Sequence, residues 1–254
     1  MPAESPRPGG AVTGDAPGDR ASHGRCAANV QSALTTIYRF RPLALLPALG
    51  AALAAMATPA WAEPVRLMML GDSLTAGYGL PPEDGFTSQL EAALGEAGLD
   101  VAVLNHGVSG DTTAGGRARL DWALADAPDA VIIELGANDM LRGLDPAQAE
   151  VNLDAMLERL TGEEDLPVLL AGMLASPSWG AGYQAEFDAI YPALAERHEV
   201  PLYPFFLDGV AGDPALNQSD GLHPNAAGVA AIVERIAPVI VDWLAAEGLA
   251  EPAT

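Results

Sequence analysis

The chain of 254 residues holds 12 arginines, no lysine and 34 acidic residues, for a formal net charge of −22. This acidity disfavours general nucleic-acid binding and adsorption to anionic membranes, because both need a basic surface. The lone cysteine, Cys26, excludes an internal disulfide and a zinc site built from cysteines. Half of the residues are hydrophobic, which is enough to build a folded core.

The first 62 residues have the order of a secretory signal. A Pro-, Gly- and Ala-rich stretch precedes the positive cluster Arg39-Phe40-Arg41, an apolar run over 42–57 and the small-x-small tripeptide Ala60-Trp61-Ala62. We expect residues 1–62 to be a leader and signal peptide, and the protein to be periplasmic or secreted. The alternatives are an uncleaved membrane anchor and an N-terminal core helix. No stable anchor is expected, because a spanning helix needs about 20 strongly apolar residues.

From residue 63 onward, short apolar runs alternate with stretches of helical spacing. Strands are predicted at 65–70, 101–104, 130–135, 168–172 and 201–205. Helices are predicted at 86–97, at 113–125, after the Asp145-Pro146 start signal, at 181–198 and at 225–245. This alternation predicts that residues 63–254 form a single α/β domain, a three-layer α/β/α sandwich around a parallel sheet of about five strands.

The carboxyl ends of parallel strands lie along one edge of a sheet, where ligands bind in open α/β folds. At the first such end stands Ser73, within Gly71-Asp72-Ser73-Leu74-Thr75. A serine between a strand and a helix start can be a nucleophile, with backbone N–H groups nearby that favour developing negative charge. By itself this serine is more often an ordinary helix cap.

After the last predicted strand comes Ser219-Asp220-Gly221-Leu222-His223-Pro224. Because Gly221 permits a tight turn, the carboxylate of Asp220 can fold back onto the imidazole of His223 and orient it toward a hydroxyl. The alternative is a capping aspartate beside a surface histidine.

Two further strand ends carry hydrogen-bond donors. Gly110 offers an unhindered backbone N–H, and Asn138 offers a side-chain NH₂. Such donors aimed at one point form an oxyanion hole, whereas each alone is typical of a turn. The conjunction of nucleophile, donors and Asp–His pair, all at strand ends, favours acyl-transfer chemistry.

These blocks resemble those of the SGNH (GDSL) hydrolases. The resemblance is closer to one branch, the bacterial thioesterase I and arylesterase group, on motifs that span nearly all of residues 63–254: residues 70–79 (LGDSLTAGYG), 109–113 (SGDTT), 134–139 (ELGAND) and 189–192 (AIYP). The resemblance implies a flavodoxin-like SGNH hydrolase fold. It also implies that Ser73 is the nucleophile, His223 the general base and Asp220 the residue that orients it. The N–H groups of Ser73 and Gly110 and the Asn138 amide would bind the oxyanion.

The expected activity is that of a serine esterase on acyl esters, acyl thioesters or both, of the arylesterase, thioesterase and lysophospholipase type. It would proceed through an acyl-enzyme and need no metal or organic cofactor. The alternatives are a carbohydrate O-deacetylase and a non-catalytic lipid- or sugar-binding module on the same fold. The expected partner is a small-molecule ester or thioester, and the oligomeric state is left open.

Substrate-binding residues are expected near the fourth strand end. Leu174 and Trp179 are candidates for an apolar acyl groove. Tyr183 and Phe187 belong either to that groove or to a helix face packed on the sheet. Arg142 would contact an anionic group of the substrate or pair with a neighbouring acid. His106 is expected to be a partly buried loop residue, and His198 to be solvated at a helix end.

Overall fold

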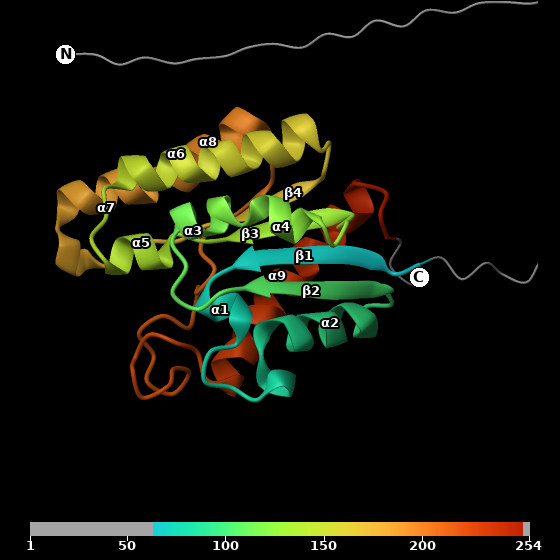
Figure 1. Ribbon diagram of the computed structural model, residues 1–254. Coiled ribbons are helices and arrows are strands. Elements are labelled where there is room, and N and C mark those ends of the chain that lie inside the picture. The colour runs from blue at the N-terminus through green and yellow to red at the C-terminus, as the bar shows by residue number, and fades with distance from the viewer. Residues whose placement is uncertain (1–62, 251–254) are drawn as a thin grey trace, which may run out of the picture. The chain divides into compact units, whose positions relative to one another are not determined.

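Five parallel strands build the central sheet of the computed structural model, which describes residues 63–250 (Figure 1). The predicted leader and signal peptide lie outside the described residues. The sheet order is β2-β1-β3-β4-β5. The strands are β1 (Val65–Gly71), β2 (Val101–Gly107), β3 (Ala130–Glu134), β4 (Val168–Ala171) and β5 (Leu202–Tyr203). The predicted five-stranded parallel sheet is therefore confirmed.

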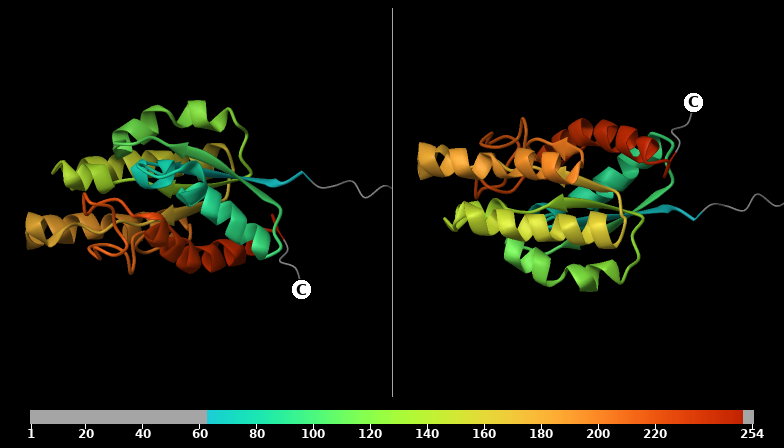
Figure 2. Two further views of the ribbon diagram at one scale, coloured as in Figure 1. Left: turned by 90° about the horizontal axis from the view of Figure 1, so that it is seen from below. Right: turned by 90° about the horizontal axis from the view of Figure 1, so that it is seen from above.

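Helices cover both faces of this sheet, as a three-layer sandwich requires. α2 packs against α9, and α3 and α4 lie on the opposite side of β1 and β2 (Figure 2). α6 lies between α3 and α8. The α-helices are α1 (Ser73–Ala76), α2 (Phe86–Glu96), α3 (Thr113–Ala118), α4 (Leu120–Leu124), α5 (Ala137–Leu141), α6 (Pro146–Leu157), α7 (Ala181–Asp188), α8 (Ile190–His198) and α9 (Ala226–Ala246), with short turns η1 (Pro82–Asp84), η2 (Glu158–Glu163) and η3 (Pro177–Trp179).

Two predicted helices are each broken into two. The stretch 113–125 divides at Arg119, whose φ of −108° and ψ of 5° lie outside the helical range. The stretch 181–198 divides at Ala189. Pro192 explains the second break, because it has no N–H to donate to the carbonyl four residues earlier.

Two strand lengths also differ from the prediction. β2 continues to Gly107, since its last three residues pair with Met69, Leu70 and Gly71 of β1. β5 is only two residues long. The Asp145 cap is confirmed, because its side chain accepts the N–H of Ala147 at 3.0 Å.

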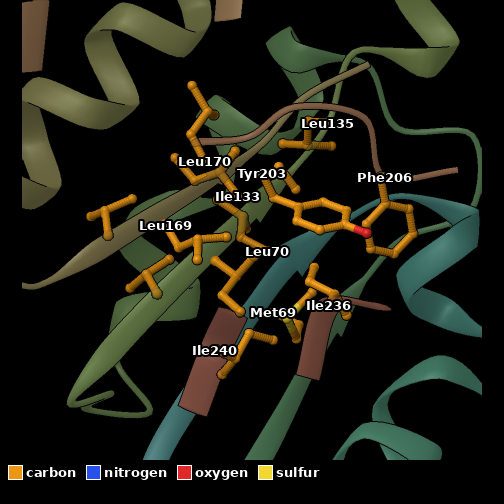
Figure 3. Close-up of a cluster of buried hydrophobic side chains, with 14 of the residues drawn as sticks. Met69, Leu70, Ile133, Leu135, Leu169, Leu170, Tyr203, Phe206, Ile236 and Ile240 are labelled. Carbon is orange, nitrogen blue, oxygen red and sulfur yellow. The ribbon is translucent and has the colours of Figure 1, made fainter. Parts of the chain in front are cut away.

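The core lies between the sheet and the helices. Side chains of β1, β3 and β4 gather against Ile236 and Ile240 of α9 (Figure 3). All five residues of β3 are buried, including Glu134. Strands covered on both faces are continuously apolar, which is the pattern from which they were predicted. This packing fixes the carboxyl ends of the strands on a rigid edge.

That edge carries the loops predicted to hold the site. β1 leads into α1, β2 into the turn at 108–111, and β3 into α5, while a long segment connects β5 to α9. Among the helices of the described region, none is long and apolar enough to cross a membrane.

Candidate active site

Ser73, His223 and Asp220 form a continuous hydrogen-bonded chain. Nε2 of His223 lies 2.9 Å from Oγ of Ser73, and Nδ1 lies 2.6 Å from Oδ2 of Asp220. Ser73 is the first residue of α1, directly beyond β1, as the sequence predicts. A hydroxyl, an imidazole and a carboxylate in this order can activate the hydroxyl as a nucleophile.

The segment 217–224 folds so that Asp220 turns back onto His223. Gly221 adopts a φ of +70°, the left-handed conformation that glycine tolerates. Oδ1 of Asp220 accepts the N–H groups of Leu222 and His223, at 2.9 and 3.0 Å. The predicted tight turn is therefore present, and its two backbone N–H groups hold the carboxylate of Asp220 in place.

These bonds also fix the charge of Asp220. The backbone N–H of His223, its ring and the N–H of Leu222 lower the pKa of Asp220 to about 2. Asp220 is therefore ionised at neutral pH, and it favours the tautomer with hydrogen on Nδ1 of His223. Nε2 then faces Ser73 as a proton acceptor.

Tyr78, for which no role was predicted, packs on His223. The two ring centroids lie 4.5 Å apart with a tilt of 36°. The backbone carbonyl of Tyr78 accepts a hydrogen bond from Nε2 of Gln218 at 2.8 Å. Tyr78 therefore braces the imidazole from the α1 side. Its sequence signal is its place in the motif over residues 70–79, two residues after α1 ends at Ala76.

The predicted oxyanion donors surround the same sheet edge. Gly110 lies in a turn closed by the N–H of Asp111 donating to the carbonyl of Val108 at 3.0 Å, and its φ is +85°. Within residues 63–250, the N–H groups of Ser73 and Gly110 donate no hydrogen bond. Nδ2 of Asn138 donates to Oδ2 of Asp72 at 2.9 Å, which leaves its second hydrogen for a ligand.

Two buried carboxyl groups lie beneath the serine. Asp72 caps α1 by accepting the N–H of Leu74 at 3.0 Å, so the cap interpretation holds for Asp72 rather than for Ser73. The N–H of Asp72 and the hydroxyl of Thr75 both donate to Oε2 of Glu134, at 3.3 and 2.8 Å. A side chain on Gly71 would collide with Thr75 and Glu134, which explains the glycine.

Burial dominates the protonation of this pair. It raises the pKa of Asp72 to about 6, and it raises the pKa of Glu134 well above its ordinary value, with the nearby charge of Asp72 as the second cause. Burial therefore favours the protonated form of Glu134. Its sequence signal is a lone acid at the end of an apolar strand, and no role was predicted for it.

Asp139 ties the Asn138 helix to the helix beyond the Gly110 turn. It is buried, and its two oxygens accept the N–H and the hydroxyl of Thr113, at 2.8 and 2.7 Å. Since Thr113 opens α3, this contact connects the two loops that were predicted to carry the oxyanion donors. Asp139 had no predicted role of its own.

A cavity of about 750 Å³ opens beside the site. Its lining is mainly apolar and includes Met140, Leu141, Leu174, Trp179, Leu207 and Leu222. Leu174 and Trp179 thus lie where an acyl groove was expected. Phe187 is buried in the core instead, and the hydroxyl of Tyr183 donates to the carbonyl of Leu144. The helix-packing alternative is therefore correct for Phe187.

Arg142 and two histidines differ from expectation. Nη2 of Arg142 donates to the carbonyl of Gly110 at 2.6 Å, and in the described region it makes no ion pair with an acid. His106 is buried as expected, but it lies in β2 and contacts Asp126 at 3.0 Å. The prediction of a solvated His198 is wrong, because its Nε2 lies 2.7 Å from Oδ1 of Asp154 and its side chain is mostly covered.

Comparison with known proteins agrees with this architecture. The family model of the GDSL-like lipase/acylhydrolases matches residues 69–231. The chain belongs to this family. It is 43% identical over 180 residues to an arylesterase from Vibrio mimicus, covering 70% of this chain and 90% of the relative. It is 37% identical over 180 residues to thioesterase 1/protease 1/lysophospholipase L1 from Escherichia coli strain K12, covering 70% and 81%.

A solved structure gives the same result. AlinE4, an esterase of the SGNH-hydrolase family, is 45% identical, with a TM-score of 0.61 over 72% of this chain and 97% of that chain. The family membership and these relatives show that the protein is an ester hydrolase with the fold of the SGNH hydrolases.

Proposed function

We propose that this ester hydrolase cleaves acyl esters and acyl thioesters by acyl transfer to Ser73, with His223 as general base and Asp220 as its orienting partner. The observation that carries the proposal is the chain Ser73–His223–Asp220, with contacts of 2.9 and 2.6 Å. Both distances lie within hydrogen-bond reach, as proton transfer from nucleophile to base requires.

In the first half-reaction, Oγ of Ser73 attacks the acyl carbonyl carbon while Nε2 of His223 takes the hydroxyl proton. The carbonyl electron pair moves onto oxygen and forms the tetrahedral oxyanion. When this collapses, the bond to the leaving group breaks, and His223 returns the proton to the leaving alcohol or thiol. The acyl group is then an ester of Ser73.

In the second half-reaction, water replaces the leaving group. His223 takes a proton from water, the hydroxide attacks the acyl carbon, and the proton returns to Oγ of Ser73 as the acid departs. Asp220 remains ionised throughout and stabilises the imidazolium that forms in each half-reaction.

The N–H groups of Ser73 and Gly110 and the free N–H of Asn138 would bind the oxyanion. Donors that are already oriented cost no rearrangement at the moment of reaction. Asp72 accepts a hydrogen bond from the Asn138 amide, and Asp139 holds Thr113, which follows the Gly110 turn. These contacts orient the donors before any substrate binds.

The cavity supports acyl chains as the substrate class. Its volume of about 750 Å³ and its leucine, methionine and tryptophan lining suit an aliphatic chain longer than acetyl. The arylesterase and thioesterase names of the relatives support the same class. A carbohydrate O-deacetylase would use the same three residues but would not need this apolar volume.

A substrate series tests the proposal. The purified protein and its Ser73→Ala variant would be assayed with p-nitrophenyl esters from acetate to palmitate, with acyl-CoAs, and with acetylated xylan. We expect kcat/KM to rise with chain length beyond acetate, and Ser73→Ala to be inactive on every substrate. Turnover of acetylated xylan alone would instead support the deacetylase, and a folded protein inactive on all three would support a binding module.

We also propose that residues 1–62 direct export and are removed after Ala62. The support is the charged, apolar and small-residue order of that segment. Amino-terminal sequencing of protein from the periplasmic fraction or the medium should begin at Glu63. Full-length protein retained in the cytoplasm would contradict export.

A further inference from the structure

A largely buried arginine connects two loops of the proposed site. Arg119 lies at the break between α3 and α4, and its side chain is 16% exposed. Its Nε donates to Oδ2 of Asp111 at 2.6 Å, and its Nη2 donates to the carbonyl of Gly71 at 2.8 Å. One guanidinium thus donates hydrogen bonds to two acceptors that lie 40 positions apart in the sequence.

Both acceptors are close neighbours of proposed site atoms. Gly71 ends β1, and Ser73 follows two residues later. Asp111 comes directly after Gly110 and donates its own N–H to close the turn that presents the Gly110 N–H. The arginine therefore bridges the loop of the nucleophile and the loop of an oxyanion donor.

The surroundings are shaped for this bridge. The carbonyl of Gly71 also accepts the N–H of Val108 at 3.1 Å, so both ends of the Val108–Asp111 turn are tied to the end of β1. A side chain on Gly115 would collide with the carboxylate of Asp111, so this glycine lets α3 approach it. Nη1 of Arg119 is buried without a hydrogen-bond partner in residues 63–250, so Nε and Nη2 make the hydrogen bonds of this guanidinium.

We propose that Arg119 is a positioning residue, which sets the distance between Ser73 and the Gly110 N–H by holding Gly71 and Asp111 together. The inference rests on the proposed function. A guanidinium is a planar fork whose N–H groups can reach two acceptors at once, whereas a lysine ammonium is a compact charge without that fork. A misplacement of about 1 Å at a reacting centre can cost about 10²-fold in rate.

A residue that positions a transition-state donor affects kcat more than KM, because the oxyanion exists only after attack. A residue that only stabilises the fold would lower the unfolding temperature and the fraction of active protein. The rate per active site would then stay unchanged. The two roles can therefore be separated by titrating the active sites before measuring rates.

The test uses Arg119→Gln, Arg119→Lys and Asp111→Asn, with Arg117→Gln as the matched control. Arg117 is exposed in the last turn of α3, two residues before Arg119, and its guanidinium donates to Oδ1 of Asn152 at 3.3 Å. Each variant is titrated with a p-nitrophenyl phosphonate, and kcat and KM for p-nitrophenyl butyrate are measured per titrated site, well below the unfolding temperature.

We expect Arg119→Gln to lower kcat by about 10- to 100-fold with KM changed less than about threefold. Arg119→Lys should recover part of that loss but stay at least about fivefold below wild type, since it keeps the charge without the fork. The kcat of the double variant Arg119→Gln/Asp111→Asn should lie within about twofold of the kcat of Arg119→Gln, because both substitutions break the same bridge.

Wild-type kcat per titrated site in Arg119→Gln would overturn the inference. If that variant does not fold, Arg119→Lys carries the test, and wild-type kcat in it would overturn the inference equally. A wild-type protein that neither reacts with the phosphonate nor hydrolyses the ester would instead overturn the proposed function, so the two failures are distinguishable.

Discussion

Nε2 of His223 and Oγ of Ser73 lie 2.9 Å apart, although 150 positions separate the two residues in the chain. Ser73 is held at the end of β1, which lies between β2 and β3 in the sheet, and His223 lies in the segment between β5 and α9. Parallel strands with right-handed crossovers bring such segments to one edge. The chemistry proposed for this protein depends on this contact between Ser73 and His223.

Ser73→Ala and His223→Ala should each lower kcat on p-nitrophenyl butyrate by a factor on the order of 10⁶. The double variant should be no slower than either single variant, because the two groups act as one unit. Initial rates with circular dichroism as a folding control check this. Losses that multiply in the double variant would show that the two residues act independently.

Asn138→Ala should lower kcat by about 10²- to 10³-fold with little change in KM, since it removes one oxyanion donor worth about 3–4 kcal/mol. Stopped-flow or steady-state rates on an aryl ester measure this. The free energy of unfolding provides the control, because Asn138 also donates to Asp72. A rise in KM with unchanged kcat would assign Asn138 to ground-state binding instead.

Asp220→Asn should lower kcat by a factor on the order of 10⁴, because the amide favours the wrong imidazole tautomer.

The effect of Asp220 on the stability of the folded protein is confined to a defined range of pH. The pKa of Asp220 is about 2 in the folded protein, below its ordinary value of 3.8. The stabilisation of the folded state by ionised Asp220 is therefore fully present above about pH 3.8 and is lost as pH falls through about 2.

Urea unfolding of the wild type and of Asp220→Asn, compared at pH 6 and at pH 2.5, measures that window. The difference in unfolding midpoint should be clear at pH 6 and smaller at pH 2.5. A difference that grows on acidification would contradict the assigned charge state.

Glu134→Gln should flatten the dependence of stability on pH. The folded protein keeps a proton on Glu134 that the unfolded chain releases above about pH 4.5, so stability falls as pH rises, by on the order of 1 kcal/mol per pH unit until the raised folded pKa is reached. Gln is neutral at every pH and retains an oxygen for the N–H of Asp72 and the hydroxyl of Thr75.

Thermal unfolding of the two proteins from pH 5 to pH 9 checks this, with Glu83→Gln as an exposed control. The unfolding temperature of the control should change with pH in the same way as that of the wild type. Glu134→Gln should be at least as stable as wild type at pH 9, and the pH dependence that remains in this variant should come from Asp72. If Glu134→Gln also runs parallel, the buried carboxyl is ionised in the folded protein.

Trp179→Ala should shift chain-length preference. Trp179 lines the cavity and packs against Gly143 and the ring of Tyr183. Its loss should lower kcat/KM for p-nitrophenyl octanoate relative to acetate by about 10-fold, the order expected for 1–3 kcal/mol of apolar contact. Trp122→Ala, an exposed tryptophan outside the cavity lining, should leave that ratio unchanged. An equal loss on both esters would place the acyl chain elsewhere.

Much of the fold could be predicted because its strands are buried on both faces. Continuous apolar runs marked β1, β3 and β4, and their alternation with helices predicted a parallel sheet. The break at Arg119 was missed because a helical period continues across it. The break at Ala189 did have a sequence signal, Pro192, which the prediction of one helix over 181–198 did not use. β2 was too short in the prediction, since Asn105 and His106 are polar although they pair with β1.

The site divides in a similar way. Ser73, Gly110 and Asn138 follow the ends of β1, β2 and β3, and Asp220 and His223 lie in the segment between β5 and α9. All of these segments follow a strand, so the predicted topology already brought them to one edge. The supporting contacts could not be predicted. Arg119 reaches Gly71 and Asp111 from the middle of a helical stretch, and Asp139 reaches Thr113 across two elements. Such pairs follow no period in the sequence and depend on packing that only the folded chain defines.

The proposed reaction requires that Ser73 become covalently acylated. The most direct measurement is mass spectrometry of peptides from protein treated with a p-nitrophenyl phosphonate, which leaves its phosphonyl group on an activated serine. One phosphonyl group per chain on the peptide that contains Ser73, absent from Ser73→Ala and strongly reduced in His223→Ala, is the predicted result. Stoichiometric labelling of another residue, or equal labelling of Ser73→Ala, would contradict it.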